Sequence, residues 1–161
     1  MTFERPAMTP TLSPAAEDDV PPLRPLVADA GLFPPEHLPE RFAARLHGGA
    51  HAPRWRVARD AGAVVGFAYA EPELYTNGAW NLRALAVQGA WRRRGVAQAL
   101  LAALEAELRR DGARVLVVDT SDAPDTEPAR ALYRRQGYGE GATIPEFWGP
   151  GEAKVTVWKR L

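Results

Sequence analysis

Three consecutive arginines, Arg92, Arg93 and Arg94, are the residues with the clearest chemical potential, and Gly95 follows them directly. They stand at the start of the clearest helix that the sequence predicts, residues 95–110. The first turn of a helix carries partial positive charge and unpaired N–H groups, so cations there cost about 0.3–1 kcal/mol each relative to acids. A basic, glycine-containing loop at this position is typical of a phosphate or pyrophosphate site. A solvated charge run after a turn is the alternative interpretation.

Composition and local motifs narrow the class of protein. Neither G-x-x-x-x-G-K-[ST] nor G-x-G-x-x-G occurs, which excludes the two commonest nucleotide-binding signatures. The 161 residues hold 20 Lys+Arg and 20 Asp+Glu, a balance that argues against a generally basic nucleic-acid binder.

Cysteine is absent, which excludes disulfides, a Cys-ligated zinc site and a Cys nucleophile. The three histidines lack paired ligand spacing, so we expect no metal. Without an apolar run of 18 residues or a signal sequence, we expect a cytoplasmic protein with no membrane partner.

The helix 95–110 presents a buried stripe at i, i+4 spacing, formed by Val96, Leu100, Leu104 and Leu108. Other apolar patterns and turn residues predict strands at 8–12, 54–59, 63–70, 79–87, 114–119, 138–144 and 153–159. Further helices are expected at 15–30, broken near Pro21-Pro22, at 35–47 and at 128–136. This order is α+β and predicts an α/β/α sandwich, a twisted mixed sheet of about six to seven strands with helices on both faces. We expect a single domain over 1–161, with its core at about 8–161.

Two segments resemble the motifs of a known family. Arg92-x-x-Gly95-x-Ala97, after the strand that ends at Val87, resembles motif A of the GNAT (GCN5-related) N-acetyltransferases. Residues 128–138, which read A-x-x-L-Y-x-x-x-G-Y from Ala129 to Tyr138, resemble motif B. The motifs occur in the family's order with a strand between them, and the resemblance spans roughly residues 8–161. It implies the GNAT fold.

The resemblance also implies acetyl-CoA as the donor and a primary amine, of a small molecule or a peptide, as the acceptor. The pyrophosphate of acetyl-CoA would lie against the backbone amides of residues 93–97 and the arginine side chains. Its pantetheine arm would pair with the strand end 85–87, as an added β-strand does. The cofactor-binding residues expected on this basis are Leu85, Ala86, Val87, Arg92, Arg93, Arg94, Gly95, Val96, Ala97, Thr126 and Tyr133. Among them, Thr126 stands roughly where many members carry an asparagine that contacts CoA.

For catalysis, the resemblance assigns Tyr133 as the acid that protonates the departing CoA thiolate, a role that suits a phenol beside the sulfur. A tyrosine that packs its helix on the sheet is the alternative. Asn81 stands on the central strand where several members place a carboxylate base. The base is therefore Asp119, at the end of its strand, or Glu71, Glu73 or a water chain. Asp119 is equally consistent with a strand-end or capping role.

The rival function is a non-catalytic acyl-CoA-binding or regulatory module that keeps the cofactor cradle and lacks a base. A two-fold homodimer is expected only because members of the family, and oligomers in general, often form one. The acceptor is left open, and glutamates at 36, 40, 71, 73 and 146 hint at a cationic amine. Tyr75, Phe147 and Trp148 are expected on loops near the strand ends, where they either line a substrate pocket or cover the sheet.

Overall fold

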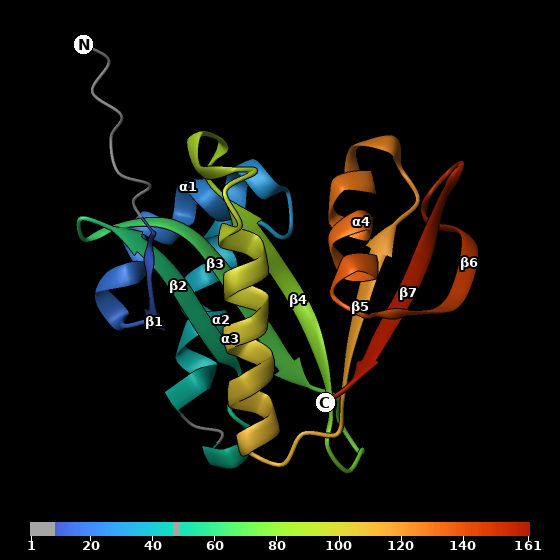
Figure 1. Cartoon of the computed structure of the whole chain (residues 1–161), viewed down its shortest axis with the longest axis horizontal. Coiled ribbons are helices and arrows are strands. Elements are labelled where there is room, and N and C mark those ends of the chain that lie inside the picture. The colour runs from blue at the N-terminus through green and yellow to red at the C-terminus, as the bar shows by residue number, and fades with distance from the viewer. Residues whose placement is uncertain (1–8, 47–48) are drawn as a thin grey trace.

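A single seven-stranded sheet organises the chain, in the order β1-β2-β3-β4-β5-β7-β6 (Figure 1). The computed structural model describes residues 9–46 and 49–161. Neighbouring strands are antiparallel except β4 and β5, which are parallel. The expected mixed sheet of six to seven strands is therefore confirmed.

The strands are β1 (Thr11–Pro14), β2 (Arg54–Asp60), β3 (Ala63–Pro72), β4 (Ala79–Val87), β5 (Val115–Ser121), β6 (Gly139–Gly149) and β7 (Glu152–Arg160). The α-helices are α1 (Val20–Ala30), α2 (Leu38–Ala43), α3 (Val96–Arg110) and α4 (Glu127–Arg135). Short 3-10 turns are η1 (Glu17–Asp19), η2 (Pro35–His37), η3 (Ala44–Leu46), η4 (Gly49–His51), η5 (Gly89–Trp91) and η6 (Pro124–Thr126).

Each face of the sheet has its own apolar core. On one face, α1 and α2 bring Leu23 and Phe42 against Trp55 and Phe67 of the strands. On the other face, the predicted stripe of α3 is buried in full, and Tyr133 of α4 joins the same cluster. The helices thus cover both faces, as the sequence predicts for an α/β/α sandwich.

Several element boundaries differ from the sequence-based expectation. The expected break near Pro21-Pro22 is instead the start of α1 at Val20, since proline fits the first helical turn, where its missing N–H forms no bond. β6 extends to Gly149 through Pro145 and through Glu146, whose φ is 59°. Its pairing with β7 shifts register twice, which breaks the period-2 signal. Residue 8, the expected start of the first strand, and residue 47, the expected end of the second helix, lie outside the described residues.

β4 is the strand that shapes the site. It pairs with β5 only from Ala79 to Leu82, and beyond that point the two strands diverge (Figure 1). On its other side, Leu82 pairs with Ala70 and Ala84 with Tyr69, so Arg83 is an extra residue, a β-bulge. A bulge bends a strand and re-aims side chains, and bulges are frequent beside active sites. Here the bulge lies where the parallel pairing with β5 ends.

Candidate active site

Beyond the bulge, β4 presents unpaired backbone groups to the opening between β4 and β5. The Gln88 N–H donates to the Val65 carbonyl at 2.8 Å, and bonded pairs alternate along an antiparallel ladder. Leu85 and Val87 therefore direct their N–H and C=O groups away from β3, towards the split. The Ala86 backbone groups point to β3 instead. Leu85 thus presents both backbone groups to the split, and Val87 presents its N–H, because the Val87 carbonyl accepts from Arg92 Nε.

The loop between β4 and α3 leads directly to this opening. Arg93 and Gly95 have left-handed backbone conformations, with φ of 59° and 76°. Gly95 is the N-cap of α3, which places the unpaired amides of the first helical turn at Val96 and Ala97. Left-handed residues of this kind bring successive N–H groups into anion-binding concavities. The backbone is therefore competent to hold phosphate.

The three arginine side chains differ in their contacts. The Arg92 Nε donates to the Val87 carbonyl at 3.1 Å, and its guanidinium lies 3.5 Å from Asp29. Arg94 lies over the ring of Trp91, 5.2 Å from its centroid. All three arginines are exposed. Arg92 is therefore not only a solvated charge after a turn, because its side chain also binds the last backbone carbonyl of β4.

Tyr133 lies on the α3 and α4 face of the sheet and is 5% exposed. Its ring packs against Tyr138 at a centroid distance of 5.5 Å. Burial raises the pKa of the Tyr133 phenol, so the hydroxyl keeps its proton at neutral pH. A protonated phenol is the form that a general acid requires.

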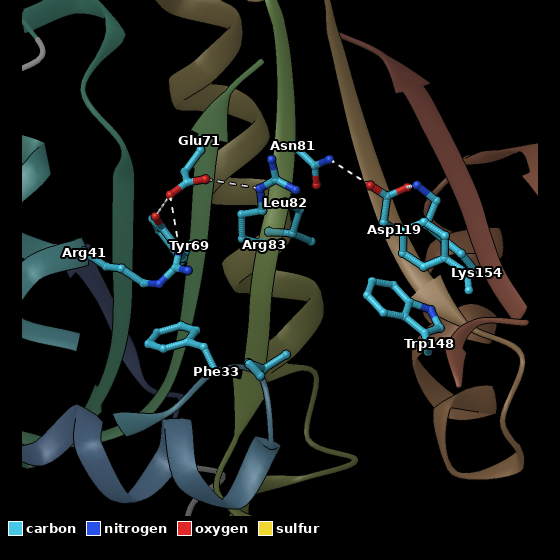
Figure 2. A pocket seen from close by; sticks show the side chains of 12 residues that line it. Phe33, Arg41, Tyr69, Glu71, Asn81, Leu82, Arg83, Asp119, Trp148 and Lys154 are labelled. Carbon is cyan, nitrogen blue, oxygen red and sulfur yellow. Dashed lines mark hydrogen bonds and ion pairs between the residues drawn. The ribbon is translucent and has the colours of Figure 1, made fainter. Parts of the chain in front are cut away.

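A pocket of about 510 Å³ opens on the opposite face of the sheet, over the split between β4 and β5. Figure 2 shows Arg41 and Phe33 on one side of the opening and Trp148 and Lys154 on the other. The lining residues are Leu32, Phe33, Arg41, Tyr69, Glu71, Asn81, Leu82, Arg83, Asp119, Phe147, Trp148 and Lys154. Seven different strands and helices, or the loops that follow them, contribute to this wall.

Asn81 joins two carboxylates at the deep end of the pocket. Its Nδ2 donates to Glu73 Oε1 at 2.8 Å and to Asp119 Oδ2 at 3.1 Å, and the side chain is 2% exposed. The Thr156 hydroxyl donates to the other Asp119 oxygen at 2.7 Å, and Lys154 Nζ lies 3.7 Å from it. Burial opposes ionisation of Asp119, but these hydrogen bonds and the charges of Lys154 and Arg83 outweigh it. The net result is a lowered pKa for Asp119 and a stable carboxylate.

Glu71 is the second partnered carboxylate of the pocket. It accepts hydrogen bonds from the Tyr69 hydroxyl and, at 3.2 Å, from Arg83 Nε. The Arg41 guanidinium lies 3.7 Å from Glu71 Oε1, the oxygen that accepts from Tyr69, whereas Arg83 donates to Oε2. Arg83 also lies 3.6 Å from Glu73. Glu71 therefore orients two guanidinium groups at the pocket.

Other residues considered in the sequence have defined places. The Thr126 hydroxyl donates within its own turn, to the carbonyls of Ser121 and Ala123 at 2.7 and 2.8 Å. Tyr75 is fully exposed and does not line the pocket, whereas Phe147 and Trp148 do. Glu146 accepts from the Gly151 amide at 3.1 Å.

Sequence reasoning missed Phe33, Arg41, Arg83 and Lys154 as pocket residues. Asn81 and Arg83 are the polar residues of an otherwise apolar strand, which is a signal for a polar site on one face. Arg41 carries no such signal, because α2 is brought to the pocket only by tertiary packing.

Within the described ranges, no three His, Asp or Glu side chains are close enough together to hold a metal ion. Of the helices that the structure describes, none is both long and apolar enough to cross a membrane.

Comparison with known proteins places this geometry in a family. The model of the acetyltransferase (GNAT) family matches residues 20–138. None of the curated protein sequences matches the chain. A solved protein from Desulfovibrio desulfuricans, assigned to the GNAT family, is 26% identical with a TM-score of 0.84, over 94% of this chain and 98% of that one.

Two further solved structures share the fold. The ribosomal-protein-alanine N-acetyltransferase of Brucella melitensis is 24% identical with a TM-score of 0.80, over 94% of this chain and 99% of its own. An aminoglycoside 6'-N-acetyltransferase in complex with coenzyme A is 18% identical with a TM-score of 0.80, over 93% and 96%.

The split sheet and the folds that it matches define an acetyltransferase scaffold. The chain belongs to the GNAT acetyltransferase family, whose donor is acetyl-CoA and whose acceptors are amines.

Proposed function

We propose that this protein transfers the acetyl group of acetyl-CoA directly to a primary amine held in the pocket of Figure 2. The observation that carries the proposal is the split between β4 and β5. It presents the backbone N–H and C=O of Leu85 and the N–H of Val87 on one strand, and the pocket lies over the same opening. A thioester in the split would thus face the pocket.

The chain's own groups fit acetyl-CoA along its length. The pantetheine arm, which carries amides, would add to β4 as a short strand through Leu85 and Val87. The pyrophosphate would lie at the left-handed loop and the first turn of α3, beside the arginine side chains. Thr126, whose hydroxyl is used within its turn, would offer the cofactor only van der Waals contact.

Attack of the amine nitrogen on the thioester carbonyl forms the C–N bond and breaks the C–S bond. Tyr133, protonated and buried on the cofactor face, donates its proton to the departing thiolate. The amine loses one proton to water, and the Tyr133 phenolate takes one proton back from water, so the enzyme returns to its starting state with no net change in protons. With no cysteine in the chain, an acetyl-Cys intermediate is impossible, which favours direct transfer.

Asp119 is the carboxylate of the pocket that stands at the split. Its lowered pKa makes it a weak proton acceptor at neutral pH. As a fixed negative charge, however, it stabilises the positive charge that develops on nitrogen during attack. We propose this electrostatic role for Asp119, with the proton transferred through water.

The role of Tyr133 is tested by Tyr133→Phe, with release of CoA measured by a thiol reagent, since the protein contributes no thiol of its own. We expect kcat to fall by about 10²- to 10⁴-fold, the usual share of a general acid. Tyr138→Phe is the matched control, because Tyr138 is a neighbouring buried tyrosine that bonds Glu105 at 2.9 Å. Normal turnover by a folded Tyr133→Phe protein would rule out this acid.

The cradle is tested by thermal unfolding with and without acetyl-CoA. A ligand at 100 times its Kd adds about 2.7 kcal/mol, which corresponds to a rise of about 5–10 °C for a chain of this size. We expect Arg94→Glu to lose most of that rise. Arg110→Glu, at the opposite end of α3, is expected to keep it. Equal rises in both variants would contradict the phosphate assignment.

A further inference from the structure

Three cations and two carboxylates line the pocket. The cations are Arg41, Arg83 and Lys154, and the acids are Glu71 and Asp119. A third acid, Glu73, lines the adjoining pocket of about 400 Å³, but it lies 3.6 Å from Arg83 and accepts from Asn81 at 2.8 Å. The formal charges of these side chains balance, so which of them attract a ligand depends on the partners that each already has.

Both carboxylates already have strong partners within the protein. Glu71 is bound by the Tyr69 hydroxyl and by Arg83, and Asp119 by Thr156 and Asn81. A cationic ligand would have to compete with these hydrogen bonds. The glutamates of the sequence hint at a cationic amine as the acceptor. The hydrogen bonds that the structure gives these carboxylates weaken that argument.

The cations Arg41 and Lys154 are in the opposite situation. Each lies 3.7 Å from its carboxylate, beyond hydrogen-bond distance, and neither donates a hydrogen bond to any residue of 9–46 or 49–161. Each is held over an aromatic ring instead, Arg41 at 4.9 Å from the Phe33 centroid and Lys154 at 4.4 Å from that of Phe147. Guanidinium and ammonium groups are donors only, so the N–H groups that solvent now satisfies are available to an acceptor on a ligand, ideally an anion.

The same rings make the pocket walls apolar and planar. Phe33 and Trp148 stand on opposite sides of the opening (Figure 2), and Phe147 lies beside Trp148 on β6. The two aromatics of β6 pack edge to face, 4.7 Å apart, and Trp148 Nε1 donates to the Thr120 carbonyl at 3.1 Å. Trp148 is thereby fixed beside the split, where it can contact an apolar side chain of the acceptor.

We propose that the acceptor is an amino acid with an apolar side chain, a primary amine that carries a carboxylate on the same small molecule. Its amine faces Asp119 at the split, its carboxylate binds Lys154 or Arg41, and its side chain packs on the aromatic walls. This inference rests on the proposed acetyltransferase function and specifies its substrate class.

The test compares amino acids with their decarboxylated amines in the CoA-release assay. Suitable pairs are phenylalanine with 2-phenylethylamine, tyrosine with tyramine, and leucine with 3-methylbutylamine, each of which differs only in the carboxylate. Phenylalaninamide and a dipeptide with an N-terminal phenylalanine distinguish a free amino acid from a peptide terminus. A hydrogen bond to a charged group is worth about 1.5–3 kcal/mol, so we expect kcat/KM at least tenfold higher for the better amino acid than for its amine.

Lys154→Met and Arg41→Met provide the second readout. At least one of them should lower kcat/KM for the amino acid about tenfold more than it lowers kcat/KM for the decarboxylated amine, with Arg110→Met as the matched control. Amines that equal or exceed their amino acids overturn the inference and leave the acetyltransferase proposal intact. A panel without any acetylation also overturns it, and the thermal shift with acetyl-CoA then decides separately whether the cofactor site stands.

Discussion

Replacement of Asn81 by aspartate tests the electrostatics of the pocket most directly. The Asn81 Nδ2 donates to Glu73 and Asp119 at 2.8 and 3.1 Å from an almost fully buried position. Asn81→Asp keeps the shape and replaces the donor by a third carboxyl. We expect this carboxyl to have a raised pKa, because two negative charges lie about 3 Å away and water is excluded.

The magnitude follows from these contacts. At an effective dielectric constant of about 20, two like charges about 3 Å apart repel by roughly 5 kcal/mol, so the new carboxyl takes up a proton rather than ionise. Holding that proton at pH 7 costs about 4 kcal/mol relative to an unfolded carboxyl with a pKa near 3.9. A protonated carboxyl donates one hydrogen bond where Asn81 donated two, which adds about 1.5–3 kcal/mol.

The assay is urea unfolding of the wild type, Asn81→Asp and Asn81→Leu between pH 5 and pH 8. The introduced group binds a proton in the folded state and not in the unfolded state, so stability falls as pH rises from about 3.9 to the folded pKa. We expect the loss in Asn81→Asp to grow by about 1.4 kcal/mol per pH unit. Asn81→Leu, which adds no charge, should show a much flatter dependence. Parallel pH profiles for the two variants would refute the network as described.

Two structural predictions follow from contacts outside the pocket. Asp19 is 3% exposed and accepts from both terminal nitrogens of Arg59 at 2.6 Å, so Asp19→Asn should cost about 3–5 kcal/mol in urea unfolding at pH 7. Although burial opposes ionisation, the hydrogen bonds and charge of Arg59 lower the pKa of Asp19. The stability that the Asp19–Arg59 pair contributes is therefore present above pH 3.8 and is lost as the pH falls through the folded pKa. The variant and the wild type should converge in stability there. A Cβ on Gly66 would lie 3.0 Å from the Ala86 carbonyl oxygen and 3.2 Å from Leu100, so Gly66→Ala should cost about 1–3 kcal/mol. Gly89→Ala, which has open space around the new methyl group, should be close to neutral, and a similar Tm for both variants would contradict this packing.

The helices and central strands could be predicted because their signals are local. The stripe of α3 repeats at helical spacing, and β4 was bounded at Ala79 and Val87 by a turn on one side and a polar loop on the other. The strand that the sequence predicts here ends at residue 144, before the end of β6, because Pro145 and the glycines do not continue the alternation of a strand. Its bonds to β7 come from tertiary pairing with two register shifts, which no local pattern reports.

The loop and the pocket also differ in how far the sequence predicts them. The loop at Arg92–Gly95 is contiguous, so residue types alone indicated an anion site. The pocket is assembled from residues as far apart as Phe33 and Lys154. Glu71 and Asp119 were recognised as carboxylates, but their partners Tyr69, Thr156 and Arg41 come from other elements. Which charges are satisfied, and hence what the pocket binds, depends on that assembly.

The bulge at Arg83 does carry a sequence signal, and it links the two halves of the site. Strict alternation from Trp80 would place residues 80, 82, 84 and 86 on one face, yet the large apolar residues are Trp80, Leu82, Leu85 and Val87. This change of phase requires one extra residue between Leu82 and Leu85, which is where the register shifts. The same irregularity coincides with the end of the pairing between β4 and β5, and Arg83 lines the pocket at that point. One extra residue in β4 therefore stands where the proposed cofactor site and the proposed acceptor pocket adjoin.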